Sequence, residues 1–187
     1  MRCQDCDLHR TSTRAVPGEG PENASIVFIG EAPGWNEDQQ GRPFVGPAGQ
    51  FLDQLLASAN LPRDKVYITN IVKHRPPSNR DPLPAEIKAC ERWLDRQLET
   101  IKPKIIVTLG RYSMSKFLPS ETIGKIHGVA RKMDNMVVVP MYHPAAALHQ
   151  GSLRKTIEAD FQKLPQVLAG IEQVEVATPA AQQLSMF

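Results

Sequence analysis

Four short apolar runs, separated by stretches of helical pattern, constrain the fold of this chain more than any other feature. They cover residues 25–29, 66–72, 105–109 and 136–141 and are rich in valine and isoleucine. Continuous apolar runs of this length suit strands that are buried on both faces of a sheet. Alternation of such strands with helices predicts an α/β fold with a parallel sheet.

The segments between these runs have helical signals. Phe51, Leu52 and Leu55 recur at the spacing of one helix face. Pro84 suits the first turn of a helix, where its missing N–H costs nothing, and Pro103 ends the same helix. We expect helices over residues 48–59, 84–102, 111–118 and 153–168.

Length and composition indicate one globular domain. A chain of 187 residues supports one sizeable core. We expect this domain over residues 1–170, with residues 1–23 as an arm that lacks hydrophobic periodicity. The stretch 171–187 is rich in Ala, Pro and Gln and is expected to be a flexible tail.

Charge and hydropathy narrow the possible surroundings of the protein. The net charge is +2, so any surface that binds nucleic acid must draw on local basic residues. No apolar run is long enough to cross a membrane, and the chain lacks a signal-peptide core. We therefore expect a cytoplasmic, nucleoid-associated protein without a membrane partner, and a monomer.

Each predicted strand carries a polar signature at its carboxyl end. Gly30 and Glu31 follow the first strand, Asn70 lies near the end of the second, Gly110 follows the third and His143 the fourth. In parallel sheets, ligands bind outside the carboxyl ends of the strands, so these residues are expected to line one site.

Each signature also has an ordinary structural reading. The Gly30 turn suits any strand end, Asn70 suits a helix cap, and His143 suits the surface. Phe44, on a glycine-bounded loop, suits the core. It is their occurrence together, in this order, that favours a functional site.

Four phrases carry a resemblance to a known family. They are GEAPGWNED from Gly30, GRPFVGPAG from Gly41, ITNIVKHRPPSNRDP from Ile68 and HPAAAL from His143. From Cys3 to about Leu168 the chain resembles the family 4, iron-sulfur type of uracil-DNA glycosylases. The resemblance implies a three-layer αβα fold around a four-stranded parallel sheet.

The same resemblance implies a function. The protein would flip deoxyuridine out of single- or double-stranded DNA and hydrolyse the N-glycosidic bond, leaving an abasic site for base excision repair. It would be a monofunctional enzyme, since no lysine accompanies the motifs to form a Schiff base.

The resemblance also assigns roles in the site. Phe44 would stack on uracil, the Asn70 amide would accept from N3–H and donate to O4, and His143 would donate to O2 of the leaving base. Glu31 and Glu37 are the carboxylates available to position water, and which of them does so stays open. Glu37 would also exclude the thymine methyl group. The expected substrate-binding residues are Gly30, Ala32, Gly34, Phe44, Asn70 and His143.

Three cysteines and a histidine suggest a metal centre. By resemblance, a [4Fe-4S] cluster is expected on Cys3, Cys6, His74 and Cys90, with His74 replacing the family's usual cysteine. Zinc held by three cysteines and one histidine is the alternative metal, and His9 or water is the alternative fourth ligand.

DNA contacts are expected outside the base pocket. Arg75, Arg80 and Arg154 are candidates for phosphate contacts, and Lys73 is a weaker one. By resemblance, Leu148 or Leu153 would fill the gap that the flipped base leaves.

The tail resembles the peptide that docks bacterial proteins on the sliding clamp. The residues that would do so here are Gln183, Leu184, Met186 and Phe187.

Two other functions fit parts of the sequence. One is a relative that binds uracil-DNA, or links to it covalently, with little turnover. The other is a nucleotide-binding redox or zinc module that shares only the α/β plan. The HPAAAL motif and the Phe44 loop argue against the redox or zinc module. The RPPSNRDP loop follows His74 without an Arg-rich insertion, which favours an enzyme with turnover over a covalent binder.

Overall fold

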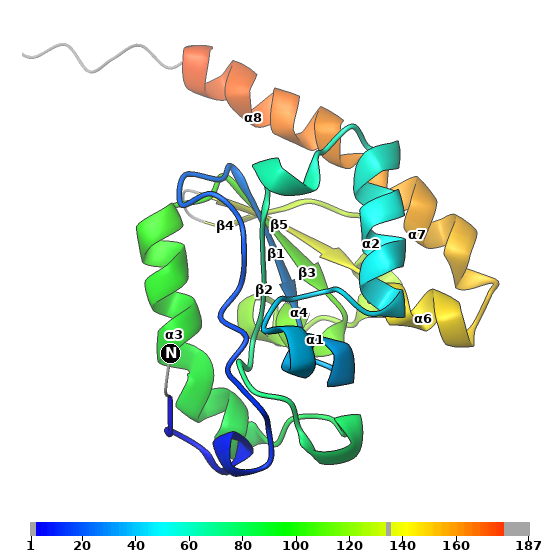
Figure 1. Cartoon of the computed structure of the whole chain (residues 1–187). Coiled ribbons are helices and arrows are strands. Elements are labelled where there is room, and N and C mark those ends of the chain that lie inside the picture. Colours follow the sequence, from blue (N-terminus) through cyan, green and yellow to red (C-terminus); the bar gives the residue numbers. More distant parts are fainter. Residues whose placement is uncertain (1–2, 134–135, 178–187) are drawn as a thin grey trace, which may run out of the picture.

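The computed structural model describes residues 3–133 and 136–177. A central sheet lies between two layers of helices (Figure 1). Its strands lie in the order β2-β1-β3-β5-β4. Their bounds are Ile26–Gly30 (β1), Tyr67–Asn70 (β2), Ile105–Leu109 (β3), Arg131–Met133 (β4) and Met136–Met141 (β5).

The sheet confirms the predicted α/β fold and adds one strand to it. β1, β2, β3 and β5 are parallel, as expected for the four apolar runs. β4 pairs antiparallel with β5 at the edge, so the sheet has five strands and not four. The pattern Arg131-Lys132-Met133 has a single apolar residue, so it gives no hydrophobic signal of a strand.

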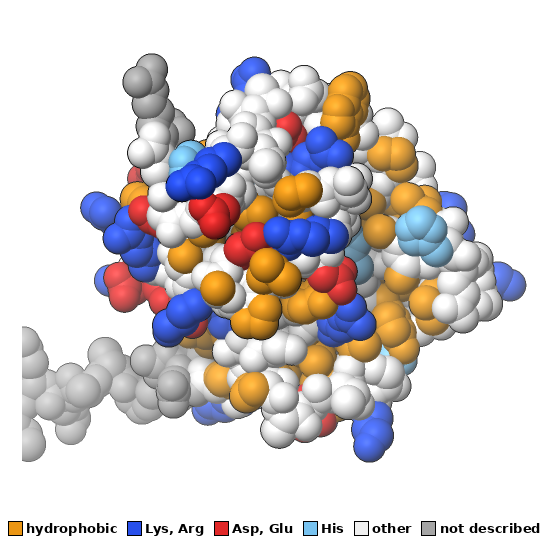
Figure 2. Space-filling view, turned by 90° about the horizontal axis from the view of Figure 1, so that it is seen from below, with side chains coloured by type: hydrophobic (Ala, Val, Ile, Leu, Met, Phe, Trp, Pro, Cys, Tyr) orange, Lys and Arg blue, Asp and Glu red, His pale blue; other side chains and the backbone are white. Residues whose placement is uncertain are grey.

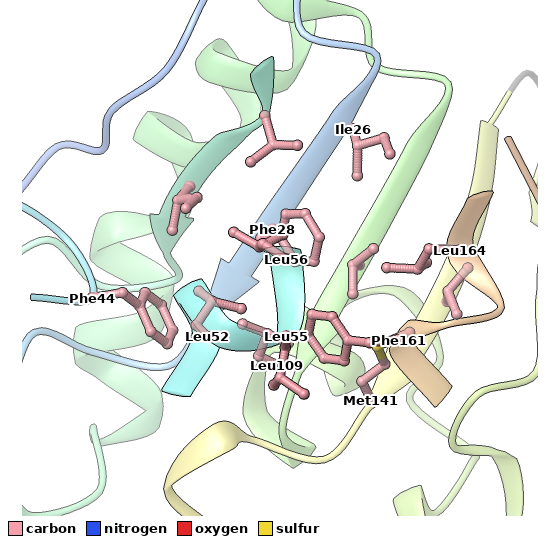
Figure 3. Close-up of a cluster of buried hydrophobic side chains, with 14 of the residues drawn as sticks. Ile26, Phe28, Phe44, Leu52, Leu55, Leu56, Leu109, Met141, Phe161 and Leu164 are labelled. Carbon is pink, nitrogen blue, oxygen red and sulfur yellow. The ribbon is translucent and has the colours of Figure 1, made fainter. Parts of the chain in front are cut away.

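Alternation along the strands separates two cores. Phe28 points toward the layer of α2 (Pro47–Ser58), α7 (Leu153–Phe161) and α8 (Leu164–Ala177). Val27, the next residue back, points toward α3 (Pro84–Ile101) on the other face. Figure 3 shows the first core, in which Phe28 stacks on Phe161 with 5.9 Å between the ring centroids.

The carboxyl-terminal helical region differs from the prediction. The single helix expected over 153–168 is interrupted between Phe161 and Leu164. Pro165 has no N–H for an ongoing helix but suits the first turn of a new one. α8 then continues to Ala177, into the stretch that was expected to begin a tail at residue 171.

Several short elements complete the described chain. Three of the α-helices escaped the sequence analysis because each is too short to show a period: α1 (Trp35–Gln40), α5 (Ile123–Ile126) and α6 (Pro144–His149). α4 (Arg111–Phe117) was expected. The 3-10 turns are η1 (Asp7–Arg10), η2 (Arg63–Lys65) and η3 (Pro77–Asn79). Among the described helices, none is both long and apolar enough to cross a membrane.

The amino-terminal arm is docked by its own contacts. Leu8 and Val16 are buried. Glu19 forms an isolated antiparallel bridge with Ile68, and its carboxylate binds the side chain of Arg63. The arm therefore covers the free edge of β2, which would otherwise be exposed to other chains.

Candidate active site

A cleft of about 600 Å³ opens at the carboxyl ends of the parallel strands. Figure 2 views this end of the molecule from below, where basic, acidic and hydrophobic side chains are interspersed over the face. The predicted site residues that line the cleft are Glu31, Ala32, Gly34, Glu37, Phe44, Asn70, Arg80, His143 and Leu148. The fold therefore brings Glu31, Asn70 and His143 to one cleft, whereas Gly30 and Gly110 are not among its lining residues.

The loop that carries Phe44 is held in a strained conformation. Phe44 has φ +51°, a left-handed value that a bulky side chain rarely adopts. Arg63 fixes the loop by donating to the carbonyl oxygens of Pro43 at 2.6 Å and Phe44 at 3.2 Å. An unfavourable backbone conformation that surrounding hydrogen bonds hold in place is typical of functional sites.

Glu37 fixes the loop from the other side. Its Oε1 accepts from the backbone N–H groups of Val45 and Gly46, each at 2.8 Å. Its Oε2 accepts from the N–H of Gly34 at 3.1 Å. Both carboxylate oxygens are therefore engaged with backbone that shapes the cleft.

Gly30 allows Phe44 and Asn70 to meet. A Cβ at Gly30 would lie 2.6 Å from Phe44 Cζ and closer still to Asn70 Oδ1, nearer than real Cβ atoms approach. Glycine at the end of β1 is thus required for the close approach of these two side chains.

Asn70 presents an unused acceptor. The residue is 1% exposed, and its Oδ1 has no hydrogen-bond partner among the residues that the structure describes. A buried acceptor without a partner costs free energy, so such an atom in a cleft points to a ligand that donates to it.

His143 is arranged as a neutral hydrogen-bond donor. Its Nδ1 accepts from the N–H of Ala145 at 3.1 Å, at the start of α6, so the neutral ring carries its proton on Nε2. Loss of hydration lowers the pKa of His143 to about 4, although the Glu37 carboxylate opposes this. The ring stacks on Phe44, with 5.5 Å between centroids, and lines the cleft.

Glu31 is the titratable carboxyl in the cleft. Burial, together with the negative charge of Asp81, raises its pKa to about 7 against the opposing effect of Arg111. Asp81 itself accepts from Tyr112 Oη at 2.6 Å and from the Arg111 guanidinium at 2.7 Å.

The candidate DNA-contacting residues differ in their availability. Leu148 is 50% exposed at the cleft, whereas Leu153 packs against the core. Arg80 makes a bidentate ion pair with the Glu86 carboxylate, at 2.6 and 2.9 Å. The other two arginines are also engaged. Arg75 binds Asn79, and Arg154 binds Glu158 and Gln54 and lies over the Phe51 ring.

Lys73 does not fit the weaker prediction of a phosphate contact. It is only 2% exposed, and its Nζ donates to three protein oxygens. Burial lowers its pKa to about 7, yet three acceptors match the three N–H bonds of the protonated group. Sequence alone favours an exposed lysine, and only the packing of α3 and the arm buries it.

The expected metal ligands lie between the arm and α3. Cys90 is 4% exposed, and Cys6 packs in the same core. Burial raises the pKa of Cys90 to about 11 against the opposing effect of Lys73, and Cys6 and Cys3 are near enough to contribute to the rise. His74 is 6% exposed, and burial and the neighbouring His9 lower its pKa.

The structure does not show a formed metal site at these residues. Within residues 3–133 and 136–177, no group of three or more His, Cys, Asp or Glu side chains is arranged to hold a metal ion. Three unpaired thiols near one another form a donor set of the kind that such clusters use.

The cleft includes residues that the sequence analysis did not single out. Trp35, which lines it, is 56% exposed. Its place directly after Gly34 in the GEAPGWNED phrase was the available signal. The other unpredicted polar lining residues are Asn36, Asn79 and Asp81. The expected clamp-binding residues Gln183, Leu184, Met186 and Phe187 lie outside the described residues.

Comparison with known proteins gives consistent relatives. The family model described as the uracil DNA glycosylase superfamily matches residues 17–168. A type-4 uracil-DNA glycosylase of Archaeoglobus fulgidus is 48% identical over 173 residues, which is 88% of this chain and 87% of the relative. One of Thermotoga maritima is 42% identical, covering 87% of each chain. A type-5 uracil-DNA glycosylase of Thermus thermophilus is 38% identical over 56% of this chain and 54% of its own.

Proposed function

The chain belongs to the type-4 group of the uracil-DNA glycosylase superfamily, and on this premise we propose that its cleft excises uracil from DNA. The enzyme is a hydrolytic N-glycosylase of DNA repair, which flips the deoxyuridine out of the strand and leaves an abasic site. It acts without a covalent lysine intermediate, in single- and double-stranded DNA.

One observation carries the proposal. The Asn70 Oδ1 is buried in the cleft without a partner, beside the Phe44 ring. Uracil offers a donor at N3 to this oxygen and an acceptor at O4 to the amide nitrogen. Cytosine offers the reverse pattern and leaves both groups unpaired, which selects strongly against it.

The reaction breaks the bond between the sugar C1′ and the base N1. The bonding electrons leave with the uracil ring, whose negative charge spreads to O2. His143, neutral with its proton on Nε2, donates a hydrogen bond to that oxygen and keeps its proton. Phe44 supports the base by stacking against it.

Water completes the hydrolysis by adding to C1′ and losing a proton. We assign the positioning of this water to Glu31 and not to Glu37. Glu37 already accepts three backbone hydrogen bonds, whereas no hydrogen bond involves the Glu31 side chain among the described residues. Gly34 and Ala32 complete the lining on this side, and Glu37 holds the loop that shapes the pocket.

A [4Fe-4S] cluster bound by Cys3, Cys6, His74 and Cys90 fits the donor set between the arm and α3. The cluster would supply a structural link, since it would tie the arm to α3 at a distance from the cleft. Zinc on the same residues is the alternative metal. His9 is the alternative fourth ligand, because its Nδ1 lies 2.6 Å from the Cys6 carbonyl oxygen and this contact leaves Nε2 available.

DNA is proposed to approach over the exposed rim of the cleft. Leu148 is the residue that would fill the gap in the stack, since Leu153 packs in the core. Arg75, Arg80 and Arg154 remain candidates for phosphate contacts, each by exchanging a present partner. The tail from Gln183 to Phe187 is proposed to dock on the bacterial sliding clamp.

A cleavage assay tests the proposal. A labelled oligonucleotide with one uracil is incubated with wild type, His143→Ala or Asn70→Ala and then treated with alkali. Strand scission by wild type that falls about 100-fold or more in each variant is expected. A gel-stable protein–DNA species without scission would indicate a covalent binder instead. Absence of both would contradict the proposed function.

A further inference from the structure

Lys73 is a buried cation that no carboxylate neutralises through a hydrogen bond. Its Nζ donates at 2.7 Å to each of three oxygens: Thr69 Oγ1, the Asn70 carbonyl and Gln97 Oε1. Lysines are almost never buried so completely unless every N–H finds a partner. The ammonium therefore ties the end of β2 to α3.

The same side chains bind the arm. The Pro17 carbonyl accepts from Thr69 Oγ1 and from Gln97 Nε2, each at 2.7 Å. The N–H of Val16 donates to the Lys73 carbonyl at 2.7 Å. Arm, α3 and the end of β2 thus meet at one hydrogen-bond network.

The network ends at the residue that reads the base. Asn70 Oδ1 lines the cleft and has no hydrogen-bond partner among the described residues to orient it. Its position depends on packing beside Phe44 and Gly30 and on its own backbone, whose carbonyl oxygen accepts from Lys73. An error of about 1 Å in placing such a group costs on the order of 100-fold in rate.

We infer that Lys73 and Gln97 are positioning residues that hold the Asn70 side chain where it can bind the base. Docking of the arm through Pro17 would in turn fix the positions of Gln97 and Lys73. The inference rests on the proposed function. It gives the amino-terminal arm a role in base recognition, although none of its described residues, 3–23, lines the cleft.

The test compares three variants with a control. Lys73→Met removes the ammonium. Gln97→Leu removes all four hydrogen bonds of the amide, which are to Lys73, Thr69, Pro17 and Tyr67. Gln97→Glu keeps an acceptor for Lys73 but loses the donor to Pro17. The control is Thr100→Val, one turn along α3, because Thr100 bonds only to the Arg96 carbonyl. Each protein is assayed for excision of uracil, for inhibition by free uracil and for binding to DNA with an abasic site.

Abasic DNA separates base reading from general damage, because it has no base for Asn70 to contact. We expect Lys73→Met and Gln97→Leu to lower kcat/KM about 10- to 100-fold and to weaken inhibition by uracil about 10-fold. Their affinity for abasic DNA, and all properties of Thr100→Val, should match wild type. Gln97→Glu should show an intermediate loss.

Other outcomes overturn the inference. If excision and abasic-DNA binding fall together, the network only supports the fold. If Gln97→Leu matches wild type in all three assays, the position of Asn70 does not depend on Gln97. Should Lys73→Met fail to fold, the result for Gln97→Leu alone tests the inference. Wild-type behaviour of Gln97→Glu removes the role of the arm. A wild-type protein that releases no uracil contradicts the proposed function itself.

Discussion

Glu31 is the residue whose protonation should govern the pH dependence of the enzyme. Burial raises its pKa to about 7, and only its ionised form accepts a proton from water. We expect kcat/KM to rise with pH up to about 7 and then level off, while His143 stays neutral above about pH 4. In Glu31→Gln the activity should fall and this rise should vanish. A persistent rise near pH 7 in that variant would assign the titration to another group.

The same residue should make stability depend on pH in a predictable direction. The folded pKa lies above the unfolded value of 4.5, so ionisation of Glu31 destabilises the fold. The cost is absent below pH 4.5, grows up to about pH 7 and is fully present above it. Glu31→Gln should therefore raise the free energy of unfolding at pH 8 and leave it nearly unchanged at pH 4. Urea titrations at both pH values measure this.

Trp35 should strengthen binding to DNA through its exposed indole. It lines the cleft and is 56% exposed, so a base next to the flipped nucleotide has an aromatic surface to stack on. Trp35→Ala should weaken binding of single-stranded DNA by about 1–3 kcal/mol. Leu83→Ala is the matched control because Leu83 is 52% exposed but does not line the cleft. Equal affinities of the two variants would contradict this role.

At the scale of elements, Asp160 joins α7 to the segment that follows α5. Its buried carboxylate lies 2.6 Å from His127 Nδ1 and accepts from Lys163 Nζ at 2.8 Å. Gly128 has φ +68° and leaves no room for a Cβ beside this carboxylate. Asp160→Ala should lower the free energy of unfolding by about 1–3 kcal/mol. Glu158→Ala, which breaks only a surface pair with Arg154, should cost about 0.5 kcal/mol or less.

The elements that the sequence predicted are those whose pattern is strong on its own. β1, β2, β3 and β5 are apolar runs, and α2 shows its buried face in Phe51 and Leu52. β4 and α6 have no such pattern, because β4 is defined by its pairing with β5 and α6 by the His143 cap at its first turn. The polar residues at the strand ends likewise predicted where the cleft lies. Only the folded structure shows that the Glu37 carboxylate accepts hydrogen bonds from the backbone and that Lys73 is buried.

At the scale of the whole molecule, the arm has two means of attachment. Leu8, Val16 and Glu19 dock it by packing and ion pairing, and the proposed cluster would tie it to α3 as well. Removal of iron should therefore loosen the arm and lower the melting temperature without unfolding the whole chain. Thermal unfolding before and after chelation measures this, with hydrogen exchange locating the loosened segment. Unfolding of the entire sheet on chelation would contradict it.

Iron content identifies the fourth ligand. His74 is 6% exposed, whereas His9 is partly buried and its Nδ1 lies 2.6 Å from the Cys6 carbonyl oxygen. His74→Ala and Cys90→Ser should each lose iron, while His74→Cys should keep it, since thiolate is the commoner ligand of such clusters. His9→Ala is the matched control and should retain wild-type iron. If His9→Ala loses iron and His74→Ala keeps it, the assignment is reversed. If the freshly purified protein contains zinc and no iron, the metal centre is a zinc site and not the proposed iron-sulfur cluster.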